Sequence, residues 1–127
     1  MATRNDPWFE ELLDQASDAA FVLYPAEDRF LAANPAGCTM LEHTLEELLA
    51  TPVSRIHPGE LPQLQDFVGG VLRESHGSTI SLTCRTRSGQ YLPTEMTLWA
   101  FGGGGDRVYV LALIRDRSEH RARGRGD

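Results

Sequence analysis

The stretch YLPTEMTLWAFGGGGDRVYVLALIRD, residues 91–116, predicts a long β-hairpin. Side chains alternate in type along each half, and the glycine run 102–105 is typical of a loop between strands. Alternation places Leu92, Thr94, Met96, Leu98, Val110, Ala112 and Ile114 on one face and Tyr91, Trp99, Phe101, Tyr109, Leu111 and Leu113 on the other. Both faces are apolar, so the second face also needs a cover: an N-terminal helix, a second subunit, or both.

Three further strands are expected ahead of this hairpin. Residues 19–24 and 29–33 form a second hairpin around the turn 25–28, and residues 79–86 form a single strand. Alternation in 79–86 gives Ile80, Leu82 and Cys84 a common face, which we expect to point inward. The inward register of residues 20–24 stays open.

Helical segments fill the rest of the chain. Thr44 and Glu47 have the spacing of a capping box, so a short helix is expected to start at Leu45. Apolar residues at helical spacing predict the longest helix beyond Pro58, over 61–72. Residues 6–16 predict an amphipathic helix. The sequence therefore predicts an α+β domain: a five-stranded antiparallel sheet, short helices on one of its faces, and an N-terminal amphipathic helix.

Composition narrows the class of protein. With 127 residues, 41% hydrophobic and 24% charged, the chain has the size of one globular domain. Its apolar runs are too short to cross a bilayer and no signal peptide is recognised, so we expect a cytoplasmic protein without membrane contact. Residues 1–114 carry seven arginines against fifteen acidic residues, which disfavours direct binding of nucleic acid. Cys38 and Cys84 are expected as reduced thiols, and no metal site is predicted.

Four stretches resemble motifs of the PAS domain family, the small sensor modules of bacterial signalling proteins. They are Asn34-Pro35-Ala36 with Met40-Leu41, the helix start 44–49, the turn Ile56-His57-Pro58-Gly59-Glu60-Leu61, and the exit stretch 115–121. The resemblance implies a sheet with strand order 2-1-5-4-3 and a cleft between sheet and helices. It divides the chain into a cap helix at 1–17, a PAS domain at 18–116 and an arginine-rich tail at 117–127.

The inward faces predict an apolar ligand cleft with few polar groups. Its expected wall is Met40, Phe67, Val71, Ile80, Leu82, Cys84, Thr94, Met96, Leu98, Val110, Ala112 and Ile114. The alternative is that these side chains fill one another's space and leave no cavity. The expected dimer contact is Trp8, Phe9, Leu12, Leu13, Trp99, Phe101, Tyr109 and Leu111, and the expected signal exit is Arg115, Asp116, Ser118 and Glu119.

No cofactor is predicted. The resemblance implies that a haem ligand would be a histidine on the long helix, where this chain has Gln63 and Gln65, with His57 before them and His76 after. It also implies that photoactive flavin members need an Asn-Cys-Arg-Phe-Leu-Gln motif, and the corresponding region 52–55 reads Pro-Val-Ser-Arg. Non-covalent flavin remains an alternative through stacking on Trp99, although alternation places that ring on the outer face.

The sequence therefore predicts a non-catalytic sensory or regulatory PAS domain of a bacterial signal-transduction protein, either a sensor histidine kinase or a transcriptional regulator. It senses a small apolar metabolite, forms a homodimer, or both, and signals to an output domain. The alternatives are a pure interaction and dimerisation domain without a ligand, a haem or flavin sensor, and a small enzyme on a cone-shaped α+β fold. No candidate catalytic set supports the enzyme, because the four histidines lie in turns or at helix edges without a recognisable partner.

Overall fold

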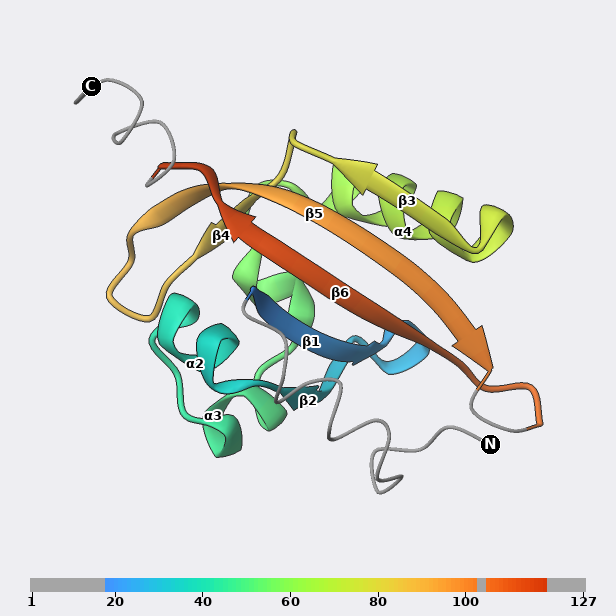
Figure 1. Cartoon of the computed structure of the whole chain (residues 1–127), viewed down its shortest axis with the longest axis horizontal. Helices are drawn as coiled ribbons and strands as arrows, with labels where there is room; N and C mark the ends of the chain where they lie inside the picture. Colours follow the sequence, from blue (N-terminus) through green and yellow to red (C-terminus); the bar gives the residue numbers. More distant parts are fainter. Residues whose placement is uncertain (1–17, 103–104, 119–127) are drawn as a thin grey trace.

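The computed structural model describes residues 18–102 and 105–118, which form an antiparallel sheet with helices on one face (Figure 1). The strands are β1 Ala19–Tyr24, β2 Arg29–Ala33, β3 His76–Thr79, β4 Thr83–Arg85, β5 Tyr91–Gly102 and β6 Val108–Asp116. The helices are η1 Pro25–Glu27, α2 Pro35–Leu41, α3 Leu45–Leu49, η2 Val53–Ile56 and α4 Leu61–Glu74. The predicted helix 6–16 and Glu119 lie outside the described residues. Within the described ranges, no helix is long and apolar enough to cross a membrane.

The β5–β6 hairpin crosses the whole molecule and forms the middle of the sheet (Figure 1). Its register runs from Gly102 opposite Val108 to Thr94 opposite Asp116. The strand order is β2-β1-β6-β5-β3, and β4 also pairs with β5. If β3 and β4 are counted as one interrupted strand, this is the predicted order 2-1-5-4-3, so the predicted fold class is confirmed.

The prediction of one continuous strand at 79–86 is wrong. Residues 80–82 lie between the two paired segments, opposite only residues 94 and 95 of β5. Thr79 Oγ1 accepts a hydrogen bond from the Ser81 N–H at 3.1 Å, which bends the chain at this point. Three residues thus stand opposite two, and the extra residue reverses which side chains of this segment point inward. Ile80 is therefore 60% exposed and is not a wall residue of the cleft, whereas Leu82 and Cys84 are buried.

The two faces of the sheet carry different apolar clusters. In β1, Phe21 and Leu23 point toward the helices, and Ala20 and Val22 point to the outer face, which settles the register that the sequence left open. The outer cluster comprises Ala20, Val22, Leu31, Ala32, Phe101, Tyr109, Leu111 and Leu113. Tyr109 packs edge-on against both Tyr24 and Phe101, with ring centroids 5.5 and 5.7 Å apart. The outer-face placement predicted for the aromatic residues of β5 and β6 is therefore correct.

The buried side chain of Asn34 ties β1 to the start of α2. Its Oδ1 accepts hydrogen bonds from the N–H groups of Ala20 at 2.9 Å and Gly37 at 2.8 Å, and its Nδ2 donates to the Asp18 carbonyl at 2.9 Å. A Cβ atom at Gly37 would lie 2.8 Å from the Phe21 ring, so only glycine allows this close approach. The Asn34-Pro35 pair thus fixes α2 against the sheet.

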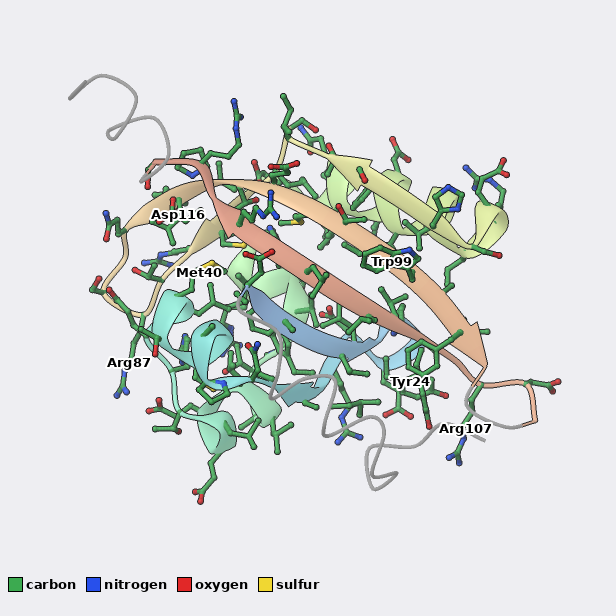
Figure 2. The ribbon with its side chains drawn as sticks, viewed as in Figure 1. Tyr24, Met40, Arg87, Trp99, Arg107 and Asp116 are labelled. Carbon is green, nitrogen blue, oxygen red and sulfur yellow. The ribbon has the colours of Figure 1, made fainter. Side chains whose placement is uncertain are left out.

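A second contact joins the β4–β5 turn to the small helices. The predicted capping box at Thr44 and Glu47 is present at the start of α3. Glu47 also pairs with Arg87 at 2.5 Å, and the Arg87 N–H donates to the Leu41 carbonyl at 3.0 Å. These contacts hold α2 and α3 beside the sheet (Figure 2).

Replacing Asn34 with alanine should lower the free energy of unfolding by about 2–3 kcal/mol, because the helix loses its N-cap and the buried Ala20 N–H loses its acceptor. Thr44→Ala is the matched control: this N-cap is exposed, and its loss should cost about 1 kcal/mol. Urea unfolding of both variants measures the difference. Equal losses would contradict the role given to Asn34.

Candidate functional site

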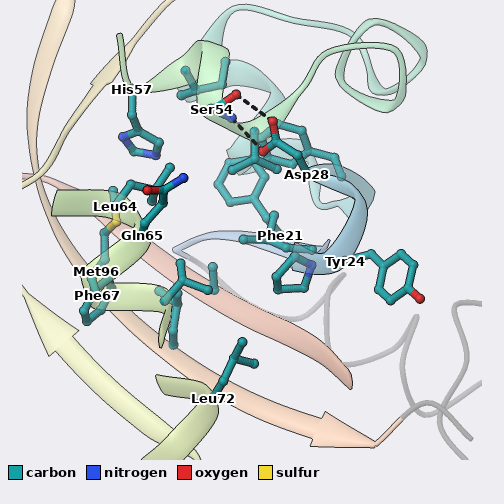
Figure 3. Close-up of a pocket in the computed structure, with 18 of the residues that line it drawn as sticks. Phe21, Tyr24, Asp28, Ser54, His57, Leu64, Gln65, Phe67, Leu72 and Met96 are labelled. Atoms are coloured by element: carbon teal, nitrogen blue, oxygen red, sulfur yellow. Dashed lines mark hydrogen bonds between the residues drawn. The ribbon is translucent and has the colours of Figure 1, made fainter. Parts of the chain in front are cut away.

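A cavity of about 710 Å³ lies between α4, the η2 turn and the inner face of the sheet (Figure 3). Phe21, Leu23, Phe67, Met96 and Leu98 are among the apolar side chains that line it. Pockets that hold small molecules typically measure about 300–1,000 Å³. The cavity is therefore large enough for a small organic ligand, and its wall is mainly apolar.

The cavity exists because α4 packs on one side of the sheet only. Val71 is buried under β3, and a Cβ atom added at Gly77 of β3 would lie 3.1 Å from Val71 and 3.3 Å from Phe67. The end of α4 is held where the Ala100 N–H donates to the Ser75 carbonyl at 2.8 Å. This packing places α4 over β3 and β5 and leaves space over β1 and β6.

The open side of the cavity has an apolar rim. Leu61 and Leu72 of α4 and Val108 of β6 line the cavity and remain 45%, 44% and 41% exposed. Large exposed apolar side chains that line a hollow are typical of ligand-binding sites. Gln65 and Asp106 also line the cavity, and both residues are exposed.

The structure places the predicted cleft residues in three different environments. Phe67, Cys84, Met96, Leu98, Ala112 and Ile114 line the cavity. Val71, Leu82, Thr94 and Val110 are buried nearby without lining it, and Met40 packs against the core. Ile80 faces solvent, as described above. The Thr94 hydroxyl points back into the sheet and donates to the Leu82 carbonyl at 2.7 Å.

Sequence reasoning missed most of the wall supplied by β1 and by residues 53–57. Phe21 and Leu23 were missed because the run 19–23 is apolar at every position and therefore shows no alternation. Val53, Ile56 and His57 lie in a short turn with no period of its own. Only their place beside the Pro58-Gly59-Glu60 turn could have drawn attention to them.

His57 is the buried polar group of the cavity wall. Its Nδ1 lies 2.6 Å from the Thr83 carbonyl oxygen and 3.7 Å from Glu60 Oε1. The Glu60 carboxylate accepts the Thr83 N–H at 3.0 Å, so one loop holds both backbone groups of Thr83. Burial lowers the pKa of His57 below its usual value, although the Thr83 carbonyl and Glu60 oppose the shift. The ring is therefore neutral near pH 7.

The other ionisable groups of the wall are acids. Both oxygens of Asp28 accept from Ser54: Oδ1 from the N–H at 3.0 Å, and Oδ2 from the hydroxyl at 2.6 Å (Figure 3). Burial raises the pKa of the Cys84 thiol to about 12, so this thiol stays protonated. In the part of the chain that the structure describes, no arginine lines the cavity and no residue cluster could hold a metal ion.

The predicted signal exit lies at the end of β6. Arg115 Nε donates to Asp18 Oδ2 at 3.1 Å, which joins the end of the sheet to the residue before β1. Asp116 Oδ1 accepts the Ser118 N–H at 2.9 Å, and Arg117 and Ser118 are already helical. Figure 2 shows Asp116 at the end of β6, far along the sheet from Tyr24.

The fold and its cavity define a small α+β domain with an apolar pocket between its sheet and its helices. The sequence pattern of the PAS domain matches residues 8–75, which is more than half of the chain. The chain belongs to the PAS domain family. No curated protein matches the sequence.

Solved PAS structures have the same fold at low sequence identity. A PAS domain from a two-component sensor histidine kinase is 22% identical, with a TM-score of 0.71, over 86% of this chain and 93% of that chain. The PAS domain of nitrogen regulation protein NR(II) from Vibrio parahaemolyticus is 15% identical, with a TM-score of 0.68, over 84% and 94%. A LOV protein from Rhodobacter sphaeroides is 18% identical, with a TM-score of 0.70, over 84% and 62%.

Acid should destabilise the protein through His57. Because the folded pKa is lowered, the unfolded chain takes up the proton first, and stability falls as the pH drops below about 6.5 toward the folded pKa. His57→Asn keeps a donor for the Thr83 carbonyl and cannot titrate, so it should flatten this dependence. Denaturant unfolding between pH 7.5 and 5 on the wild type, H57N and the exposed-site control His76→Asn measures it. A slope that survives in H57N would contradict the assignment.

The two cysteines should differ in reactivity. Cys84 is 1% exposed and its pKa is raised to about 12, whereas Cys38 is partly exposed with a pKa raised by burial. A disulfide reagent at pH 8 should modify at most one thiol per folded chain and both after unfolding. Cys38→Ser should leave none reactive in the folded state; rapid reaction of that variant would show that Cys84 is accessible.

Proposed function

We propose that this PAS domain is a non-catalytic, cytoplasmic sensory module of a bacterial signal-transduction protein, a sensor histidine kinase or a transcriptional regulator, and that it senses a small ligand in the cavity. The observation that carries the proposal is the apolar cavity of about 710 Å³ with its exposed apolar rim. The likeness to a PAS domain of a two-component sensor histidine kinase supports the same role.

The chemistry of the wall argues against catalysis. The hydroxyl of Ser54, a potential nucleophile of the wall, donates to the Asp28 carboxylate and not to a histidine. The Cys84 thiol stays protonated because its pKa is about 12. The Asp28 carboxylate is occupied by Ser54. The two potential nucleophiles of the wall, Ser54 and Cys84, are thus engaged or protonated, which favours binding over chemistry.

Haem and flavin mononucleotide fit the wall poorly. Both carry anionic groups, the propionates or the phosphate, and such groups need cationic partners when they are buried. The cavity offers Asp28 and Asp106 instead, and no arginine of the described residues lines it. Trp99, the ring considered for stacking on flavin, is on the outer face and does not line the cavity. We infer that the ligand is neither cofactor.

The outer apolar cluster supports a second role as a homodimer contact. Trp99, Phe101, Tyr109 and Leu111 lie on this face as predicted, and Trp99 is 40% exposed. The other predicted contact residues, Trp8, Phe9, Leu12 and Leu13, lie outside the described residues. Ligand sensing and dimerisation use opposite faces of one sheet, so one domain can do both. The signal would then leave to an output domain through Arg115, Asp116 and Ser118 at the end of β6.

The protein as purified should carry a bound small molecule that native mass spectrometry detects as an added mass. Ala112→Leu, which fills the cavity from β6, should remove that mass, while Ala32→Leu on the outer face should keep it. Bare protein in all three samples, or an adduct that survives in A112L, would contradict a ligand in this cavity. An absorption band at about 400 nm would instead identify haem or flavin.

The same variant separates an open cavity from a filled core. If the space is open, Ala112→Leu should change the free energy of unfolding by less than about 1 kcal/mol, since the added methyl groups find room. A filled core would be overpacked, and the loss would be about 1–3 kcal/mol. Chemical denaturation of A112L beside the wild type gives the answer.

A further inference from the structure

We infer that the ligand is an uncharged, largely aromatic molecule with a hydrogen-bond donor, an O–H or N–H group, that meets Nε2 of His57. This inference rests on the proposed function, because it names the chemical class that the same cavity would take. It follows from the donor and acceptor state of His57, from the charges on the wall, and from the side chains that enclose the rest of the space.

The contact of His57 Nδ1 with Thr83 determines that the other ring nitrogen, Nε2, is a hydrogen-bond acceptor. A carbonyl oxygen can only accept, so the 2.6 Å contact with Thr83 places a proton on Nδ1. In a neutral imidazole the second nitrogen then has no proton and accepts hydrogen bonds. The ring extends from the η2 turn toward Gln65 on α4, and both residues line the cavity (Figure 3).

Nε2 of His57, a residue that lines the cavity, has no hydrogen-bond partner among the described residues. The contacts of His57 all run through Nδ1, to Thr83 and Glu60. Among the described residues, the only side-chain nitrogen or oxygen atom that is both buried and unpartnered is Nδ1 of His43. Nε2 of His57 is not one of these buried atoms, so a molecule in the cavity can reach it. A buried site with an unpaired acceptor selects for a ligand that donates to it.

The negative charges on the cavity wall disfavour an anionic ligand. Among the described residues, Asp28 and Asp106 are the charged groups of the wall, and no arginine lines it. The hydrogen bonds from Ser54 hold the Asp28 carboxyl group in place at the edge of the cavity. A carboxylate or phosphate would lose its hydration there without gaining a positive partner. The ligand is therefore not an anion.

The remaining wall fits a flat aromatic body. Phe21 and Phe30 both line the cavity and pack against each other with ring centroids 5.7 Å apart. Phe67 and Met96 line it as well, and methionine sulfur and phenylalanine rings favour aromatic partners. The apolar part of the ligand is thus expected between these side chains, with its donor toward His57.

Three probes with the same two-ring body test the inference: 2-naphthol, naphthalene and 2-naphthoate. Amide shifts in ¹⁵N–¹H NMR titrations of the full chain give each affinity and show whether the cavity residues respond. 2-Naphthol should bind about three- to tenfold more tightly than naphthalene, which is the worth of one hydrogen bond to a neutral acceptor. 2-Naphthoate should bind more weakly than both.

Variants of the wall assign the effect to its residues. His57→Asn keeps a donor to Thr83, and its amide oxygen takes the place of the ring Cδ2, so no acceptor remains at the position of Nε2. 2-Naphthol should therefore lose its advantage over naphthalene; His76→Asn, outside the cavity, should keep it. Asp28→Asn removes one negative charge while its amide oxygen can still accept from Ser54, so 2-naphthoate should bind several-fold more tightly than it does to the wild type.

Each result decides a different claim. Equal affinity for 2-naphthol and naphthalene in the wild type, an advantage that survives in H57N, or 2-naphthoate as the tightest probe overturns the ligand class and leaves the proposed sensor standing. If no probe shifts the cavity residues, the proposed ligand site fails, and this inference fails with it.

Discussion

The contact of one loop with the backbone of Thr83 determines the shape of this PAS domain. His57 Nδ1 binds the Thr83 carbonyl, and the Glu60 carboxylate binds the Thr83 N–H. Because α4 begins at the next residue, Leu61, its first turn is fixed beside β4. Its last turn is fixed at the other end, where the Ser75 carbonyl accepts from Ala100. Held at both ends, α4 follows the edge of the sheet and does not settle over β1 and β6.

The cavity is the consequence of this placement. Hydrophobic burial favours closing an apolar space, because each lining side chain loses dispersion contacts when nothing faces it. The anchored helix resists that collapse, and a ligand would restore the missing contacts. Binding would therefore act on the same groups that position α4, because His57 contacts Thr83 on one side and faces the cavity on the other. From β4 the sheet continues through Thr94 of β5 to Asp116, where β6 ends.

The parts of this structure that follow a local pattern were predictable, and those that depend on distant contacts were not. Alternation in 91–116 gave the inward and outward faces of β5 and β6, and the spacing of Thr44 and Glu47 gave the start of α3. Ile80 was misplaced because the bend after Thr79 shifts the pairing by one residue, which alternation alone does not reveal. His57 was missed as a wall residue because its partner lies 26 residues away. The open cavity depends on how closely α4 approaches the sheet, and no pattern in the sequence records that distance.

The most direct test of this account is whether the space under β1 and β6 is open in solution. Xenon enters apolar cavities that water leaves empty, and its presence shifts the NMR signals of the residues around it. In protein freed of any bound molecule and placed under a few atmospheres of xenon, the signals of Phe21, Leu23, Met96 and Ala112 should shift together and saturate, while those of the outer cluster stay in place. Shifts that are absent, or that are confined to the outer face, would mean that α4 closes on the sheet and that the domain has no ligand cavity.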